Sequence, residues 1–273
     1  MHTHEEINTA NAAAAVLRRL ALQASGMTGA DIARIIREAR QKARREKRTL
    51  SHSDLAAVLA RSRPVRSPSM RRRIAVHEAG HVLVRLVHGL GEITFVTIDG
   101  RDGHGYVEST ADDALVQTEG GLTRLIQVFL AGHAAEQVTY GDALAGSGGS
   151  DRSDLARATA LAYLMEASLG YGTTTPLLYR DPDERVAELR LDSDLASRVN
   201  GRLEHAHATA SGLIRQRRVL LRYLSDALMR HGTLEGVELA TVLAEVRARF
   251  ENIDLPSHPS GQGAATRGIG RQP

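Results

Sequence analysis

Two histidines and a glutamate in one short run are the residues of this chain best suited to catalysis. Residues 77–81 read HEAGH, which places His77 and His81 four positions apart and so on one face of a helix. Neutral imidazoles suit Zn²⁺, and a catalytic zinc site has three protein ligands and an open position for water, which Glu78 is placed to hold. Because the chain has 12 histidines, a chance pattern of hydrogen-bonded core histidines is the alternative.

The surrounding residues predict a buried helix over residues 70–88. No proline interrupts this stretch, Ser69 can cap its start, and Gly89 and Gly91 can end it. Apolar side chains cover almost all of its circumference, which is typical of a buried helix. Buried imidazoles require partners, so this context favours a metal site.

Two further polar residues lie on the apolar face of a helix predicted over residues 122–138. His133 and Glu136 would each need a hydrogen bond or an ion there, because an unpaired buried polar group is costly. The two can pair with each other. We favour the interpretation that Glu136, with His133 beside it, supports a metal-bound histidine and fixes its tautomer, and the rival is that Glu136 binds the metal directly.

A carboxylate later in the chain is the best candidate for the third ligand. A glycine-rich loop over residues 141–150 leads to a helix predicted from Asp154 to about residue 169. An aspartate in a first turn often only compensates the helix dipole. Asp154, however, lies on the stripe that faces the core, whereas Asp151 lies in the loop. Asp154 is therefore preferred.

Composition restricts the classes of protein to which this chain can belong. The absence of cysteine excludes disulfides, thiolate zinc sites and cysteine nucleophiles. Aromatic residues make up only 3% of the 273 residues, which favours packed helices over a β-sandwich. No run of about 18 apolar residues and no secretion signal occur, so we expect a soluble, cytoplasmic protein.

The pattern along the chain predicts a mainly α protein with one small β-hairpin. A helical segment over residues 1–62 precedes a linker at 63–69, a domain at 70–255 and a disordered tail at 256–273. The hairpin is predicted from residues 93–98 and 106–107, and its edge either holds an extended peptide or only covers the core. Thr233 is expected to cap a last helix.

Several segments, taken in order, resemble FtsH-type AAA zinc metalloproteases. Residues 26–33 (GMTGADIA) and the helices after them resemble the AAA lid. The family's peptidase motifs are matched by AVHEAGH at 75–81, AGHAAE at 131–136, SDLARAT at 153–159 and GTLEGVEL at 232–239. The resemblance covers about residues 21–250. It implies His77, His81 and Asp154 as Zn²⁺ ligands, Glu78 as catalytic base and a hexameric ring.

The chain also departs from that family. It contains no G-x-x-x-x-G-K-[ST] sequence for binding phosphates, and no membrane anchor is recognisable. His133 stands where the family usually has arginine. ATP would therefore be used by a partner AAA ATPase, or by a missing part of a longer product.

The function predicted from the sequence is a zinc metalloendopeptidase that cleaves unfolded proteins or peptides with a metal-activated water. The alternative is a non-catalytic module that assembles with, or regulates, a full-length AAA protease. Residues 31–48 carry many arginines but no interleaved aromatics for stacking on bases, so we interpret them as a solvated basic face and expect no nucleic acid partner.

Overall fold

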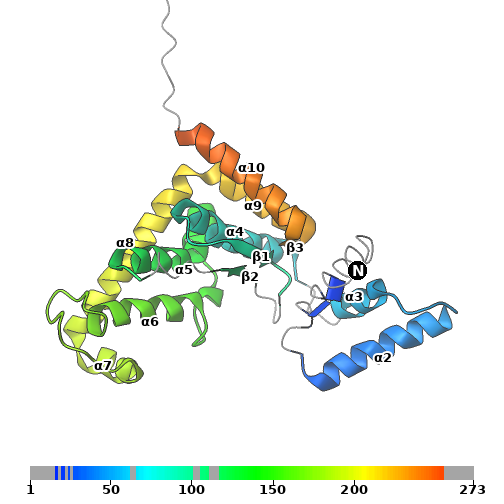
Figure 1. Ribbon diagram of the computed structural model, residues 1–273, viewed down its shortest axis with the longest axis horizontal. Coiled ribbons are helices and arrows are strands. Elements are labelled where there is room, and N and C mark those ends of the chain that lie inside the picture. The colour runs from blue at the N-terminus through cyan, green and yellow to red at the C-terminus, as the bar shows by residue number, and fades with distance from the viewer. Residues whose placement is uncertain are drawn as a thin grey trace, which may run out of the picture.

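The computed structural model describes residues 16–17, 20–21, 24, 27–61, 66–100, 105–110 and 117–254. Helices predominate in this part of the chain, and three short strands form one sheet (Figure 1). The mainly α fold predicted from the sequence is confirmed. The first 15 residues of the helical segment predicted at 1–62 fall outside the described residues, and the tail predicted at 256–273 lies wholly outside them.

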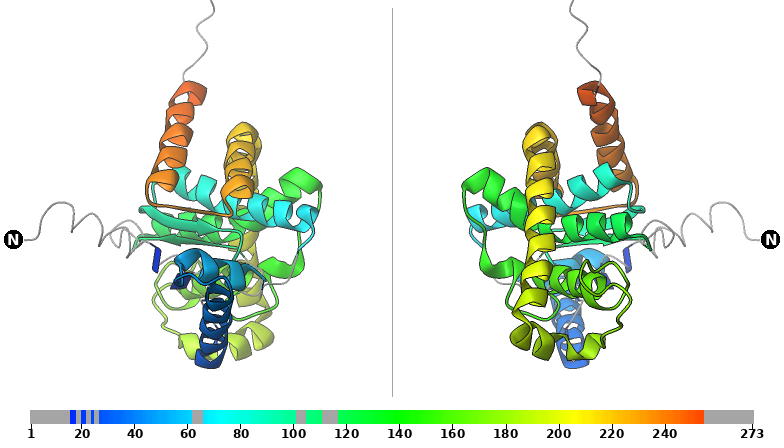
Figure 2. Two further views of the ribbon diagram at one scale, coloured as in Figure 1. Left: turned by 90° about the vertical axis from the view of Figure 1, so that its right-hand side faces the viewer. Right: turned by 90° about the vertical axis from the view of Figure 1, so that its left-hand side faces the viewer.

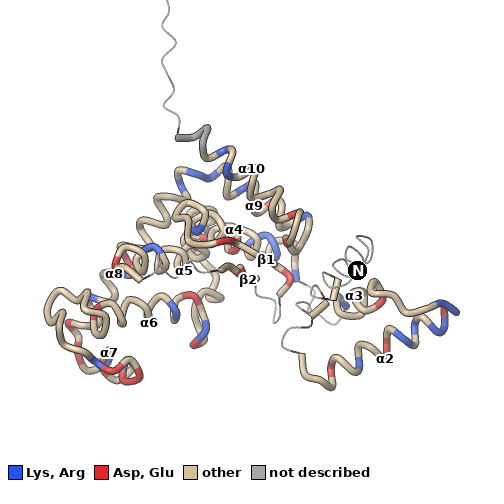
Figure 3. The backbone as a smooth tube through the Cα atoms, in the orientation of Figure 1, with Lys and Arg blue, Asp and Glu red and all other residues tan. Residues whose placement is uncertain are grey.

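Two N-terminal helices pack on each other and share a small apolar core. Helix α2 (Gly29–Arg45) begins with a capping box, in which Thr28 and Asp31 each bond the other's backbone N–H. Helix α3 (His52–Arg61) follows it. Ile35 and Ala39 of α2 pack against Val58 of α3. Lys and Arg residues gather toward the C-terminal end of α2 (Figure 3).

Helix α4 (Pro68–His88) carries the HEAGH run and begins two residues earlier than expected. Its cap is Ser67 and not Ser69, because Pro68 occupies the first helical position, where a missing N–H costs nothing. The Ser67 hydroxyl accepts a hydrogen bond from the backbone of Met70 at 3.2 Å. Gly89 ends the helix in the left-handed region, as predicted.

The sheet has the strand order β2-β1-β3 and is antiparallel throughout. Strands β1 (Ile93–Thr97) and β2 (Tyr106–Ser109) form the predicted hairpin. The third strand, β3 (Thr233–Glu235), was not predicted, and the expectation that Thr233 caps a helix was wrong. Thr233 instead pairs with Thr97, a non-local contact that the local pattern does not reveal.

The remaining helices enclose α4 and the sheet. They are α5 (Glu119–Tyr140), α6 (Asp154–Ala167), α7 (Arg185–Leu191), α8 (Ser193–Gln216), α9 (Arg218–His231) and α10 (Gly236–Asp254), with short 3₁₀ turns at Ala145–Ser147 and Pro182–Glu184. One apolar core joins α4, β1, α9 and α10, and a second joins α5, α6 and α8. Helices α9 and α10 lie on one side of the sheet, and α6 and α7 on the other (Figure 2). None of the described helices has both the length and the apolar character needed to cross a bilayer.

Candidate metal centre

Helix α4 places two imidazoles side by side at the centre of the molecule. His77 and His81 are one helical turn apart, and their Nε2 atoms lie 3.1 Å from each other. His81 is 8% exposed. Apart from half-buried His77, every residue of the helix from Ile74 to Val84 is buried, so both rings are held between α4 and its neighbours and are not free to reorient.

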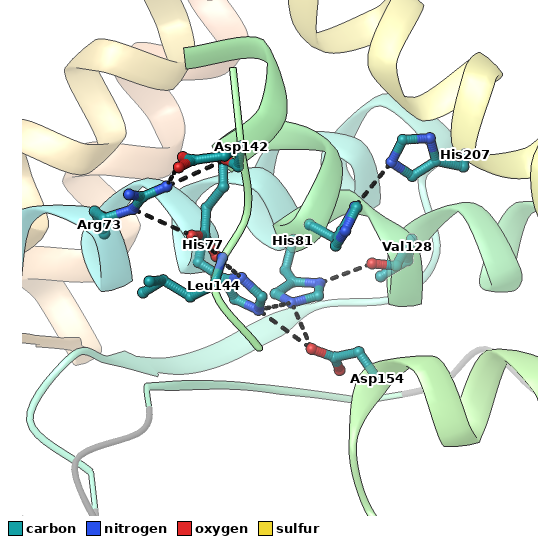
Figure 4. Close-up of polar contacts among 10 residues, drawn as sticks. Arg73, His77, His81, Val128, Asp142, Leu144, Asp154 and His207 are labelled. Carbon is teal, nitrogen blue, oxygen red and sulfur yellow. Dashed lines mark hydrogen bonds and ion pairs between the residues drawn. The ribbon is translucent and has the colours of Figure 1, made fainter. Parts of the chain in front are cut away.

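Helix α6 brings the predicted carboxylate to the same point. Asp154 is the first residue of α6, after the capping residue Ser153. One carboxylate oxygen, Oδ2, lies 3.2 Å from Nε2 of His77 and 3.2 Å from Nε2 of His81. The three side chains point toward one another from two helices that are far apart in sequence (Figure 4).

The outer nitrogens of both rings are already used as hydrogen-bond donors. Nδ1 of His81 lies 2.7 Å from the carbonyl oxygen of Val128, which can only accept. Nδ1 of His77 lies 2.8 Å from a carboxylate oxygen of Glu136. Because a neutral imidazole has one N–H, each Nε2 is then a lone pair that faces the site. Two nitrogen lone pairs and a carboxylate oxygen therefore face one another, an arrangement that requires a cation between them.

The pKa values of His77 and Asp154 also indicate that this cluster favours a positive charge at its centre. Burial alone would lower the pKa of His77, but hydrogen bonds to Asp154 and Glu136 outweigh it and raise that pKa to about 10. Burial would raise the pKa of Asp154, yet the positive charge of His81 and hydrogen bonds to both histidines hold it well below its usual range. A proton occupies the centre when nothing else supplies the charge.

Zinc fits the geometry and the ligand types of this site. Zn–N and Zn–O distances of about 2.0–2.1 Å in a tetrahedron separate neighbouring ligand atoms by about 3.3 Å. The observed separations are 3.1 Å and 3.2 Å. Two imidazoles and one carboxylate form a ligand set used by catalytic zinc, with one tetrahedral position left for water. Among the described residues, this is the one group of three side chains able to hold a metal ion.

Glu136 of α5 holds His77 from behind and is itself held firmly. Its second carboxylate oxygen accepts a hydrogen bond from the backbone N–H of Leu144 at 3.0 Å and lies 3.5 Å from Nε of Arg73. Glu136 is 2% exposed, so these contacts replace the water it has lost. It lies on the Nδ1 side of His77, away from Asp154, and is not one of the three converging groups.

Glu78 lies against the sheet beside the two histidines. It is buried, with 4% exposure, and this burial raises the pKa of its carboxyl while the charges of His77 and His81 oppose the rise. Gly105, just before β2, lies directly against it. A Cβ at position 105 would come within 2.5 Å of the Glu78 carboxylate, so only glycine leaves room for this side chain.

A second glycine leaves room for a ligand ring. Gly132 of α5 faces His77, and a Cβ there would lie 2.3 Å from Nε2 of the imidazole. Because Gly132 has no Cβ, α5 can approach α4 closely enough for Glu136 and the Val128 carbonyl to reach the two rings. Sequence reasoning missed Gly105, the Val128 carbonyl and the Leu144 N–H, and none of them gives a signal in the local pattern.

His133 hydrogen-bonds neither Glu136 nor the two converging rings, so it does not take the supporting role expected for it beside Glu136. Its Nδ1 lies 3.0 Å from Nε2 of His207 on α8. The alternative in which His133 and Glu136 pair with each other is not observed, because Glu136 points to His77. Asp151, the rival third ligand, is exposed in the loop and takes no part in the converging group.

Comparison with known proteins agrees with this arrangement. A profile of Peptidase family M41 matches residues 64–242, which is more than half of the chain. The chain belongs to peptidase family M41. The match includes both helices that carry the converging side chains, and it supports a metalloprotease function.

Relatives of this M41 chain are zinc proteases by name. It is 30% identical over 261 residues to the ATP-dependent zinc metalloprotease FtsH 1 of Sorangium cellulosum, covering 87% of this chain and 42% of that protein. It is 32% identical over 245 residues to FtsH 2 of Sphaerobacter thermophilus, covering 85% of this chain and 37% of that protein. For FtsH 3 of the same organism, the identity is 33% over 249 residues, with 85% and 49% covered. The chain thus spans less than half the length of these relatives.

Proposed function

We propose that this M41 chain is a zinc-dependent metalloendopeptidase that hydrolyses peptide bonds of unfolded proteins. The observation that carries the proposal is the convergence of three acceptor atoms, from His77, His81 and Asp154, within 3.1–3.2 Å of one another. A group of lone pairs facing one another in a buried site is unstable without a cation. The names of the relatives support zinc as that cation.

His77, His81 and Asp154 would hold the ion, and Glu136 and the Val128 carbonyl would fix the tautomer and the orientation of the two rings. When bound, zinc lowers the pKa of water and polarises the carbonyl of the peptide to be cleaved. The rest of the chemistry belongs to side chains of this chain.

Glu78 is the proposed general base. Its carboxylate would take a proton from the attacking water and then give it to the nitrogen of the departing amine. Burial raises its pKa, and a carboxylate with a raised pKa is a stronger base than one in open solvent. Gly105 lies against it on one side, and its 4% exposure leaves it little contact with bulk water.

An extended stretch of substrate fits this arrangement better than a folded one. Strand β2 lies at the edge of the sheet, and the residue just before it touches Glu78. We infer that an unfolded segment lies alongside β2 and so passes the catalytic base. This supports the substrate-holding role that the sequence left open for the hairpin.

The relatives are described as ATP-dependent, whereas this sequence has no phosphate-binding G-x-x-x-x-G-K-[ST] motif. We therefore propose that any ATP-driven unfolding is supplied by an AAA ATPase outside this sequence, on the same or another chain. Assembly into a hexameric ring is proposed on the same family grounds. The helices α2 and α3, which resemble an AAA lid, would contact that ATPase.

The proposal is tested with the purified chain, zinc and unfolded casein. Wild type should cleave casein and lose activity to a zinc chelator, with recovery on addition of Zn²⁺. Glu78→Gln should keep its zinc and lose about 10²–10⁴-fold in rate, because it lacks the base. Full activity in Glu78→Gln would exclude this role. A wild type that holds zinc but cleaves nothing would favour the alternative of a non-catalytic assembly or regulatory module.

A further inference from the structure

A cavity of about 270 Å³ opens beside the candidate metal centre. Asp154 belongs to both, since it lines the cavity and supplies the carboxylate that meets His77 and His81. Neighbouring residues of an extended peptide are about 3.3 Å apart, so a side chain in this cavity belongs to a residue next to the bond being cleaved. The volume lies below the range of about 300–1,000 Å³ for sites that hold drug-sized ligands, and is suited to one large side chain.

The walls of the cavity are mainly apolar. They are formed by Phe129 and Leu130 of α5, Leu155 of α6 and Leu203 of α8. Such walls favour an aliphatic or aromatic body, because its burial removes apolar surface from water. Three helices contribute, so the shape of the cavity depends on their packing and not on a single loop.

A buried hydroxyl without a partner marks the cavity as a polar site too. Ser147 is 6% exposed and lines the cavity, and its Oγ has no hydrogen-bond partner among the described residues. Leaving a buried hydroxyl unpaired costs about 1–3 kcal/mol, so such a group calls for a ligand atom or a water. A purely apolar side chain would leave this group unpaired.

The histidine pair of α5 and α8 adds further polar atoms. His133 and His207 both line the cavity, and burial lowers the pKa of each, so both rings are neutral near pH 7. They bond each other through one nitrogen each at 3.0 Å. In the described part of the chain the second nitrogen of each ring makes no hydrogen bond, so it remains able to bond a neutral ligand group.

The rim of the cavity carries a negative charge. Glu204 is exposed there and accepts a hydrogen bond from the side chain of Asn200 at 2.9 Å. Like charges repel at close range, so this carboxylate disfavours acidic side chains at the entrance. Burying a charge of either sign between the apolar walls is costly. The features together call for a large side chain that is neutral, apolar in its body and able to form a hydrogen bond at its tip.

We propose that this cavity is a specificity pocket that takes tyrosine, in preference to phenylalanine, from the residue next to the scissile bond. The inference rests on the proposed function and adds a substrate preference to it. The phenol ring would lie between the apolar walls, and its hydroxyl would bond the unpaired Ser147 or the histidine pair. Phenylalanine lacks the hydroxyl, so when it binds, the polar groups of the pocket are buried without a hydrogen-bond partner. A site of this kind binds such an analogue more weakly.

The first test compares two peptides that differ only by tyrosine or phenylalanine beside one cleavage site. Wild type should favour the tyrosine peptide by at least about tenfold in kcat/KM, a modest value for a pocket that is partly open to water. Ser147→Ala and His207→Leu should each bring the ratio closer to one. His205→Leu, an exposed position on the same helix, should leave it unchanged. A ratio near one in wild type, or a ratio that neither variant changes, overturns the proposal.

A binding measurement separates failure of the pocket from failure of the proposed function. Glu78→Gln with zinc is titrated with N-acetyl-tyrosinamide and N-acetyl-phenylalaninamide, and binding is followed through the NMR signals of the His133 and His207 rings. Tighter binding of the tyrosine compound, lost in Leu203→Trp because indole fills the cavity, supports the pocket even if no peptide is cleaved. Equal binding of the two compounds, or binding unaffected by Leu203→Trp, overturns it even in an active protease.

Discussion

Two histidine pairs lie close together in this molecule, and only one of them has the geometry of a metal-binding site. In the pair His77 and His81, each Nδ1 donates to an oxygen, so both Nε2 atoms face each other as acceptors beside Asp154. In the pair His133 and His207, Nδ1 of one ring bonds Nε2 of the other directly. The contact between these two rings needs one shared proton and no ion, and the second nitrogen of each ring is left for other partners.

The comparison teaches that the atoms behind the rings decide what a histidine pair can do. Carboxylates next to His77 raise its pKa to about 10 and so favour positive charge, although burial acts against it. At His133 and His207, burial dominates and lowers both pKa values. The first pair attracts a cation, and the second presents neutral hydrogen-bonding groups to a cavity.

Removing Asp154, the carboxylate that both His77 and His81 approach, should cause the largest loss of zinc affinity. Asp154→Ala removes a direct ligand and should lower zinc affinity by about 100-fold or more. Losing a residue that only hydrogen-bonds a ligand typically costs about 10–100-fold. His207→Leu should leave the affinity unchanged. The affinity is measured by competition with a chromophoric chelator. Equal losses of zinc affinity in Asp154→Ala and His207→Leu would mean that zinc binding does not distinguish the two histidine pairs.

The support behind His77 should have the next largest effect. Glu136→Gln keeps the size of the side chain but removes its charge, and should cost about 10–100-fold in zinc affinity. Asp142→Asn is the matched control, because Asp142 also pairs with Arg73 but does not touch a ligand ring. An unchanged affinity in Glu136→Gln would show that its hydrogen bond to His77 is not needed to orient the ring.

A smaller loss is expected from crowding the ligand ring. Gly132→Ala adds a methyl group that would overlap the imidazole of His77. It should destabilise the fold by about 1–3 kcal/mol, as overpacking does, and weaken zinc binding. Gly120→Ala, on the same helix with open space around it, should lower neither property. Thermal unfolding with and without zinc gives both values, and a tolerated Gly132→Ala would show that α5 can move away.

The smallest expected effect is on the pH dependence of stability, through His133 and His207. Because folding lowers the pKa of His133 and of His207, the unfolded chain binds more protons as the pH falls below about 6.5. This contribution to stability is therefore present at pH 7 and is lost as the pH falls. The drop in melting temperature from pH 7 to pH 5.5 should be smaller in zinc-loaded His207→Leu than in wild type. An equal or larger drop would contradict the neutral pair.

Much of the fold follows from local patterns. The buried helix with the HEAGH run and the hairpin at β1 and β2 were both predicted, because each depends on residues close in sequence. Strand β3 was missed, since its pairing with β1 joins residues more than a hundred positions apart. The start of α4 was misplaced because Ser67 and Ser69 offer the same hydroxyl, and Pro68 decides between them.

The site divides in the same way. The spacing of His77 and His81 determined by itself that the two rings share a helical face, because the helix repeat fixes it. The local pattern around Glu136 and Asp154 left both available as the third ligand, and it did not fix which of them hydrogen-bonds the outer nitrogen of His77. Only the packing of α5 and α6 against α4 decided that, and it also brought His207 to His133. Hydrogen-bond partners between distant helices depend on their relative placement, which no local repeat encodes.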